Sequence, residues 1–558
     1  MRKPIRTSLA LAALAVMAGG AMAPLFAATP QHDPVPALSE TIDVRVVNLE
    51  AVVTDKGIPV HGLSPDDFRL KINGEEKPIE FFSEVRGGVA LSPPAEQTGG
   101  VLGIPSIEPG EAVGTSYLVF IDDYFSIQQD RDRVLEALRN QLARLRPEDR
   151  MAVVAYDGNR LEMLSSWSSS AEALERAVLA AEQRPALGLQ RWSERRSYEL
   201  GTRLPAGLRY RRSRFVPADL GGELSPDEYF YARLLEDQIE REMMAVSSTL
   251  RGFGAAPGRR VAILLSGGWP YDIPAYVTNQ FTRTVIEPGF LTPADLYQPL
   301  VETANLLSYT LYPVDIPGMQ SSPLGVVGGS LVKDFSSPRT ATYEREVQFH
   351  HSLDHLAKQT GGLALINSAR NELVASTAGD TTSYYWLGFT PERKGDDGRW
   401  KVALEVTRPG VKVRTRRSFT DLSHEREISM AVESALLFGN PPSAQPLISH
   451  LSKGHAIGMH KMGVPLAIEV PSDAITMLPE GDHYVANLEL RVAALDRDGA
   501  SSEGRTIPLS LSVASPSPAQ NLVYEVELEL RRKTEKLVVS LYDKASGSIL
   551  MSSLDVAL

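Results

Sequence analysis

Three continuous apolar runs constrain the fold of this chain more than any other feature of its sequence. They are Tyr117–Ile121, Val261–Leu265 and Tyr309–Val314. A run of this kind is typical of a strand that is buried on both faces of a parallel sheet. Helical patterns separate the runs, for example over Leu135–Leu145 and over residues 225–251. This alternation predicts an α/β fold with a doubly wound, mainly parallel sheet.

The segments on either side of this region carry the alternating pattern of antiparallel strands. Residues 38–87 are predicted to form a small β-rich module, and residues 88–113, which lack periodicity, a linker. We assign residues 114–420 to the α/β domain and expect its last strands, at 384–416, to close it. Apolar and polar residues alternate again within residues 425–558, which predicts a C-terminal β-sandwich-like domain.

The N-terminus has the pattern of a secretory signal peptide, residues 1–27. A basic start with Arg2, Lys3 and Arg6 precedes the apolar run Leu9–Met17, and small residues follow it. The alternative, a retained anchor helix, is disfavoured because the apolar run is short. No later stretch is long and apolar enough to span a bilayer. The chain is therefore expected to be exported, periplasmic or extracellular, without a transmembrane span in its mature form.

Composition excludes several classes of function. The 558 residues include no cysteine, which rules out disulfides, a thiolate nucleophile and a cysteine-ligated zinc site. The formal net charge of −12 argues against a dedicated nucleic-acid binder. Motifs of phosphate-binding loops, of metalloproteases and of α/β-hydrolases are absent as well. His351 and His355 share a helical face but have no evident third metal ligand. We therefore predict a protein that is not an enzyme.

An ordered series of motifs carries a resemblance to a known family. The motifs are SYLVFIDDYFSI, RPEDRMAVVAYDG, PGRRVAILLSGG, LLSYTLYPVDIPGM and SYYWLGFTPERKGDDGRW. Over residues 41–420 the chain resembles the von Willebrand factor A-related proteins that are frequent in acidobacteria. The resemblance implies an A-type domain with a metal-ion-dependent adhesion site at the carboxyl ends of its strands. Such a site holds Mg²⁺ or another divalent cation.

The resemblance carries over to only part of that metal site. Asp122 matches the Asp of the family's Asp-x-Ser-x-Ser motif and Ser126 its second Ser, so these two residues are the candidate metal ligands. Tyr124 stands where the motif has its first Ser, and Gly267 where many A domains have Asp. The expected site is therefore degenerate. In the alternative reading, Asp122 caps a helix or turn.

An arginine-rich insertion, residues 184–224, is the second candidate site. Residues 184–215 contain nine Arg and only two acidic residues, which gives this segment a net charge of +7. Arg together with aromatic residues is typical of protein interfaces and of anion recognition. The candidate partner-binding residues are Asp123, Tyr124, Trp192, Arg195, Arg196, Arg211, Arg212 and Trp269. The alternative is that these arginines pair with the acidic body of the same protein.

Together these features predict an exported, non-enzymatic protein of the binding or adhesion type. We expect its partner to be an envelope or extracellular protein or an anionic glycan, recognised at the ligand face of the A domain, and not a nucleic acid. Two alternatives stay open. One is an envelope scaffold that assembles through its β modules, and the other is a metal-assisted hydrolase whose ligands converge from distant loops.

Overall fold

The computed structural model of this protein describes most of the chain after residue 46. The described residues are 47–91, 110–202, 224, 226–254, 258–278, 289–316, 339–366, 373–392, 394–438, 445–496, 501–502, 506–514, 521–546 and 548–556. The predicted signal peptide and most of the predicted linker lie outside these residues. Within them, no helix is long and apolar enough to cross a membrane.

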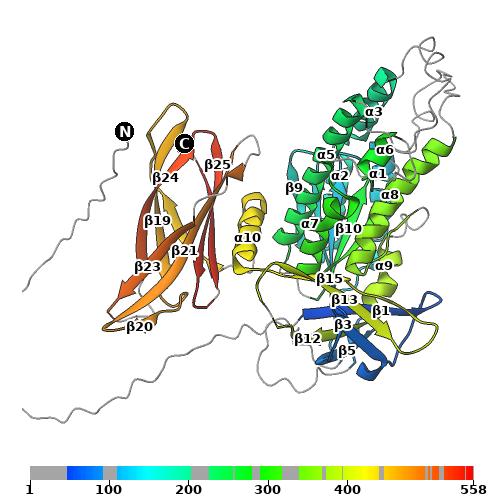
Figure 1. The fold of residues 1–558 in the computed structure, drawn as a ribbon, viewed down its shortest axis with the longest axis horizontal. Helices are drawn as coiled ribbons and strands as arrows, with labels where there is room; N and C mark the ends of the chain where they lie inside the picture. Colours follow the sequence, from blue (N-terminus) through cyan, green and yellow to red (C-terminus); the bar gives the residue numbers. More distant parts are fainter. Residues whose placement is uncertain are drawn as a thin grey trace, which may run out of the picture. The chain divides into compact units, whose positions relative to one another are not determined.

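The three apolar runs form adjacent strands of one five-stranded sheet (Figure 1). Its parallel strands are β7 (Thr115–Asp122), β8 (Arg150–Tyr156), β10 (Arg259–Ser266) and β11 (Tyr309–Asp315), and β9 (Leu161–Ser168) lies antiparallel at one edge. The strand order is β11-β10-β7-β8-β9. The prediction of a mainly parallel sheet is therefore confirmed, within a fold that is mixed α/β and also contains several antiparallel sheets.

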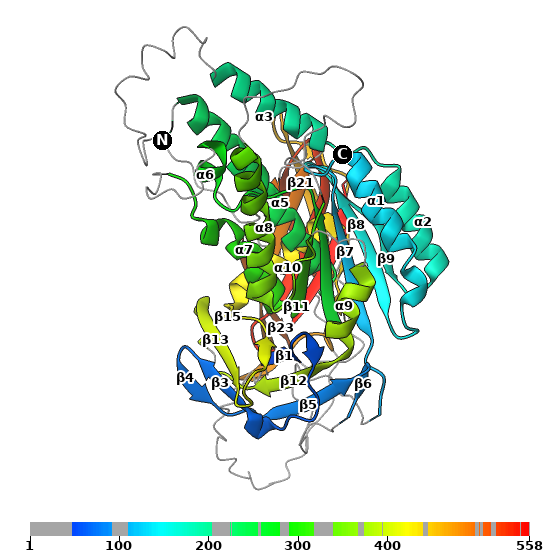
Figure 2. The same ribbon diagram turned by 90° about the vertical axis from the view of Figure 1, so that its right-hand side faces the viewer.

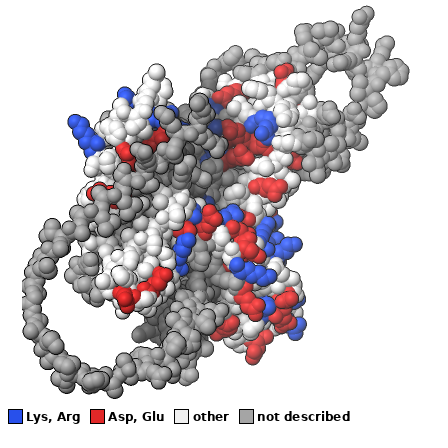
Figure 3. All heavy atoms as spheres, turned by 60° about the vertical axis from the view of Figure 1, so that its left-hand side comes forward, with Lys and Arg blue, Asp and Glu red and all other residues white. Residues whose placement is uncertain are grey.

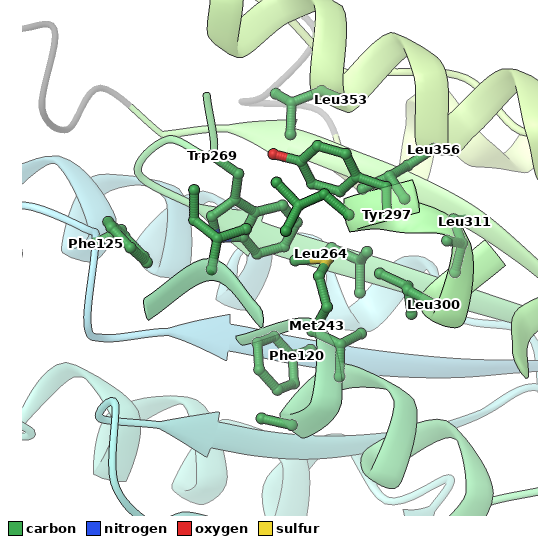
Figure 4. Packing of buried hydrophobic residues seen from close by; sticks show 14 of the residues in the cluster. Phe120, Phe125, Met243, Leu264, Trp269, Tyr297, Leu300, Leu311, Leu353 and Leu356 are labelled. Carbon is green, nitrogen blue, oxygen red and sulfur yellow. The ribbon is translucent and has the colours of Figure 1, made fainter. Parts of the chain in front are cut away.

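Helices cover both faces of this sheet. They are α1 (Gln128–Arg139), α2 (Ala171–Glu182), α3 (Gly188–Thr202), α5 (Pro226–Gly252), α6 (Ile273–Thr278), α7 (Pro293–Leu306), α8 (Arg339–Thr360) and α9 (Leu373–Thr382), with a 3-10 turn, η2, at Leu142–Arg144. Leu118 and Phe120 of β7 lie in one apolar cluster with α5 to α8 (Figure 4). Tyr117, Val119 and Ile121 lie in another with α1, α2 and α9. Burial on both faces explains why these runs are continuously apolar.

Strands from the start of the chain pair with strands that follow α9 (Figure 2). β1 (Val47–Asp55) pairs with β12 (Tyr384–Phe389) and with β14 (Lys412–Arg414), and β3 (Phe68–Ile72) pairs with β13 (Gly398–Val406). The smaller elements of these sheets are β2 (Ile58–Pro59), η1 (Pro65–Asp67), β4 (Glu75–Lys77), β5 (Phe81–Arg86), β6 (Val89–Ala90) and β15 (Ser418–Asp421). The apolar residues of both chain segments share one core.

The expectation that the strands at 384–416 close the central sheet is wrong. In the described part of the chain, β12, β13 and β14 pair with the N-terminal strands and not with β11. The physical reason lies in matching apolar faces. Leu387 and Tyr385 are opposite Leu49 and Ala51 in the register of β1 with β12, and all four side chains are buried.

Two buried arginines join the N-terminal strands to the rest of the protein. Nε of Arg259, at the start of β10, lies 3.1 Å from Oε2 of Glu50 on β1, and its guanidinium lies 4.4 Å over the ring of Tyr384. Arg416 donates a hydrogen bond to the backbone oxygen of Asn48. Because a buried charge is costly without a partner, these contacts fix the two parts together.

The C-terminal region is built of two antiparallel-rich sheets and one helix. One sheet contains β16 (Gln445–Pro446), β20 (Leu478–Glu480), β21 (His483–Asp496), β22 (Ser501–Ser502), β23 (Thr506–Val513), β25 (Thr534–Asp543) and β26 (Ile549–Asp555). The other contains β17 (Ile448–Leu451), β18 (His455–Ala456), β19 (Lys461–Pro471) and β24 (Asn521–Arg531). Apolar residues of both sheets form one cluster. Helix α10 (His424–Phe438) packs on β25 through a smaller cluster that includes Ile428 and Val538.

Candidate functional site

The carboxyl ends of the parallel strands meet at one edge of the central sheet. β7 ends at Asp122, β8 at Tyr156, β10 at Ser266 and β11 at Asp315. In open α/β sheets, ligands bind at this edge because the loops that follow the strands lie together there. Both candidate metal ligands and the start of the arginine-rich insertion lie at this edge.

Asp122 is fully buried, and both of its carboxylate oxygens accept hydrogen bonds from the protein. Oδ1 accepts from the backbone N–H of Phe125 at 2.8 Å. Oδ2 accepts from Oγ of Ser266 at 2.8 Å and from Nε1 of Trp269 at 3.1 Å. Burial raises the pKa of Asp122 to about 7, although these donors act in the opposite direction. Asp122 thus ties the loop after β7 to the loop after β10.

The residues at this edge do not fit a divalent cation. Asp122 has its oxygens turned to protein donors, and the hydroxyl of Tyr124 accepts a 2.5 Å hydrogen bond from Arg191. A Cβ at Gly267 would lie 2.2 Å from the backbone oxygen of Phe125, so a carboxylate side chain there would require the backbone to shift. Only the hydroxyl of Ser126, among the two candidate metal ligands, is buried without a hydrogen-bond partner in the described structure, and a single hydroxyl does not make a metal site. Across the same residues, no group of three or more His, Asp or Glu has an arrangement suited to a metal.

Asp123 is held by two arginines. It is fully buried, and its carboxylate pairs with Arg131, which is also fully buried, and with Nε of Arg184 at 2.7 Å. In a metal site, the cation would supply positive charge at this edge of the sheet. Here the guanidinium groups of Arg131 and Arg184 supply it. A buried carboxylate between two guanidinium groups is a fixed structural contact, because breaking either pair would leave a charge unpaired in the interior.

Glu242 on α5 belongs to this region and is absent from the sequence prediction. Its side chain is fully buried, and neither carboxylate oxygen has a hydrogen-bond partner among the described residues. Burial, reinforced by the nearby carboxylates of Asp122, Asp123 and Asp157, raises its pKa well above the ordinary value. A signal was present in the sequence, since Glu242 falls on the buried side of α5, next to Met243.

The arginine-rich insertion begins as helix α3, which is fixed to the loop after β7. The backbone N–H of Gly188 donates to the backbone oxygen of Ser126 at 2.9 Å. The guanidinium of Arg191 lies 4.5 Å over the ring of Tyr124, and that of Arg195 lies 4.1 Å over the ring of Tyr276. These first arginines therefore pack inward, as expected if the insertion pairs with its own protein.

The structure changes the assignment of the predicted partner-binding residues. Asp123, Arg195 and Trp269 are buried and expose at most 4% of their surface, so the prediction that they lie at a binding surface is wrong. The ring of Trp269 packs in the core among apolar side chains (Figure 4). Its N–H donates a hydrogen bond to Asp122. Tyr124 and Trp192 are partly buried. The backbone of Arg196 lies in α3, and Arg211 and Arg212 lie outside the described residues.

Comparison with known proteins identifies no family. The sequence matches no known family profile and no curated protein. Among solved structures, the N-terminal domain of TFIIH p34 aligns with 47% of this chain and 95% of its own, at 10% identity and a TM-score of 0.18. The pilus adhesin SpaC of Lactobacillus rhamnosus GG aligns with 88% of this chain and 61% of its own, at 8% identity and a TM-score of 0.23. TM-scores this low carry no conclusion about the fold or the function.

Proposed function

We propose that this chain is an exported, non-catalytic binding protein of the von Willebrand factor A-related type, and that it binds its partner without a metal ion. In this proposal the central sheet is an A-type domain and the C-terminal sheets form a β-sandwich. The partner is an envelope or extracellular protein or an anionic glycan. The mature chain is periplasmic or extracellular.

One observation carries this proposal: protein donors and arginines hold the two carboxylates at the end of β7. Asp122 accepts three hydrogen bonds and Asp123 pairs with two guanidinium groups, so the protein itself already occupies the oxygens that a cation would need. The same contacts make this edge a rigid base for the arginine-rich insertion, which starts from it. Recognition then falls to the parts of the insertion beyond Arg195.

The charge distribution supports a local recognition site over a general polyanion surface. On the face shown in Figure 3, basic side chains are interspersed with acidic ones and do not form a continuous stripe. An interface of this kind gains its specificity from a few arginine and aromatic residues. The face in view has no extended basic footprint of the kind that sequence-independent binding to nucleic acid needs.

The test is capture of a partner from envelope extract by the immobilised mature chain. Replacing Arg196, Arg211 and Arg212 by alanine should reduce capture about tenfold, since such residues act as hot spots. The matched control replaces the exposed Arg133 and Arg176, which lie on α1 and α2, and should capture as wild type. EDTA should change neither capture nor the melting temperature. Capture that needs Mg²⁺, or that survives the first set of substitutions, would contradict the proposal.

A further inference from the structure

Strand β24 presents an unpaired edge that none of the preceding arguments uses. It pairs with β19 over all eleven of its residues, from Asn521 to Arg531, without a register shift. In the part of the chain that the structure describes, no strand pairs with its other edge. Such an edge exposes a row of backbone N–H and C=O groups and can accept a further strand.

Several devices that commonly protect an edge strand are missing from β24, although it carries exposed charges. It contains neither proline nor glycine, it is long, and it shows no bulge. The inward side chains are apolar throughout, and they become less covered toward the start of the strand. Leu528 and Leu530 are buried, whereas Leu522, Tyr524 and Val526 are only half-buried.

The strand that precedes β24 in the sequence, β23, also has apolar side chains that are only half-buried. β23 belongs to the other sheet of the C-terminal region and pairs only with β21 among the described strands. Its Ile507 and Leu511 are half-buried and pack against the same apolar cluster as Leu522 and Val526 of β24. An added strand would therefore bury apolar surface in addition to forming backbone hydrogen bonds.

The outward side chains of β24 determine what such a strand must look like. Glu525, Glu527 and Glu529 are exposed and share one face of the strand. On the side that is paired, Glu529 forms an ion pair with Lys461 of β19, and Oε1 of Glu527 lies 3.4 Å from Nε2 of His455 on β18. A second copy of β24 would place glutamates against glutamates, which is repulsive.

We propose that β24 binds, by strand addition, an extended segment of a partner protein that carries Lys or Arg at alternate positions. The backbone of the segment pairs with the unpaired edge of β24. Its basic side chains face Glu525, Glu527 and Glu529. The apolar side chains between them cover the half-buried Leu522, Tyr524 and Val526. This mode of recognition combines backbone affinity with selectivity from alternate side chains. It is separate from the arginine-rich insertion and goes beyond the function proposed above.

The first experiment measures binding of a fluorescein-labelled peptide of alternating lysine and valine to the full mature chain. A peptide of identical composition, with its lysines and valines in separate blocks, is the control. Only the alternating peptide can place all its charges on one face of a strand. We expect the alternating peptide to bind at least about tenfold more tightly, and to slow amide hydrogen exchange in residues 521–531. Equal binding of both peptides, or protection elsewhere in the chain, would overturn the proposal.

Charge reversal supplies the second experiment. The combined substitutions Glu525→Lys, Glu527→Lys and Glu529→Lys should abolish binding of the lysine peptide and create binding of an alternating glutamate–valine peptide. The matched control replaces exposed glutamates of other elements, Glu75, Glu76 and Glu175, by lysine and should bind the lysine peptide as wild type. If the control loses binding equally, net charge and not β24 is responsible. Dimerisation through β24 in place of peptide binding would also refute the proposal.

Discussion

At the scale of single residues, the carboxyl edge of the central sheet is defined by the contacts of its buried acidic side chains. Asp122 could be predicted as important because it follows a buried strand and matches a family motif. Its role differs from the prediction: it holds a serine and a tryptophan of another loop. The sequence could not show this, because the partners Ser266 and Trp269 are more than a hundred positions away. Glu242 was not predicted for a related reason. Helical periodicity places its side chain on the buried face of α5, but the sequence does not show which residues surround it there.

Glu242 should make the stability of the protein depend on pH. In the unfolded chain it loses its proton near pH 4.5, whereas burial raises its pKa in the folded protein. Between these two pKa values the folded state binds more protons, so the free energy of unfolding falls as the pH rises. Glu242→Met removes this fall. At pH 8 the variant should be more stable than wild type by roughly 1–3 kcal/mol, the cost of burying an unsatisfied polar group.

Urea denaturation between pH 4 and pH 8 measures this effect. The advantage of the variant should grow steadily as the pH increases. Glu240→Met on the same helix is the control, because Glu240 is exposed and should give no pH-dependent gain. A constant difference between Glu242→Met and wild type across this range would show that Glu242 is not held protonated.

The pairing of Asp123 gives the second prediction at this scale. Asp123→Ala leaves Arg131 buried without this carboxylate, and removing one partner of a buried ion pair costs roughly 3–5 kcal/mol. Arg184→Met should cost much less, because Arg184 is partly exposed and Asp123 keeps its contact with Arg131. Chemical denaturation of both variants tests the difference. Equal losses of unfolding free energy in the two variants would mean that the pair with Arg131 is not the main stabilising contact of Asp123.

At the scale of elements, strands buried on both faces were the part of the fold most open to prediction. Continuous apolar runs identify β7, β10 and β11 because a parallel sheet covered by helices needs no polar face. The partners of β12 and β13 could not be read in this way. Their alternating pattern shows only that one face is buried, and several apolar faces in the chain would fit. Helix α3 was likewise not predicted, because its segment was identified by its arginine-rich composition and not by a helical pattern.

The close approach of the loops after β7 and β10 gives a prediction for Gly267. Gly267→Ala should destabilise the protein by roughly 1–3 kcal/mol, because its Cβ would collide with the backbone of Phe125 and not with a side chain that can move. Gly379→Ala in helix α9 is the control. No atom lies within 4 Å of a Cβ at that position, and alanine should be neutral or slightly stabilising.

The same position tests the interpretation of the degenerate metal site. Gly267→Asp supplies the carboxylate that many A domains have there. We expect it to lower the melting temperature and to leave that temperature insensitive to added Mg²⁺. Stabilisation of this variant by Mg²⁺, measured by thermal denaturation with and without EDTA, would show that the edge of the sheet can still accommodate a cation.

At the scale of the whole molecule, the N-terminal strands and the strands after α9 form one structural unit. Removing residues 1–91 should uncover Tyr385, Leu387 and Phe389, which are opposite β1 in the intact protein. Dye binding to exposed apolar surface, measured by 8-anilinonaphthalene-1-sulfonate fluorescence, should rise several-fold. A chain that ends at residue 423 is the control, and its fluorescence should stay low because these pairings are intact. Low fluorescence of both chains would show that another segment covers β12.

The pairing of the first strands with late ones has a consequence for how this protein comes into being. Arg416 bonds to Asn48, 368 positions earlier in the chain. A ribosome, or a secretion channel that passes the chain from its N-terminus, releases β1 long before its partners. During that interval β1 and β3 can pair only with the short strands β2 and β4, while the central sheet, which lies between them and their late partners in the sequence, can already form. We therefore expect the central sheet to fold first. The N-terminal strands, although they are synthesised first, form their long-range pairings among the last.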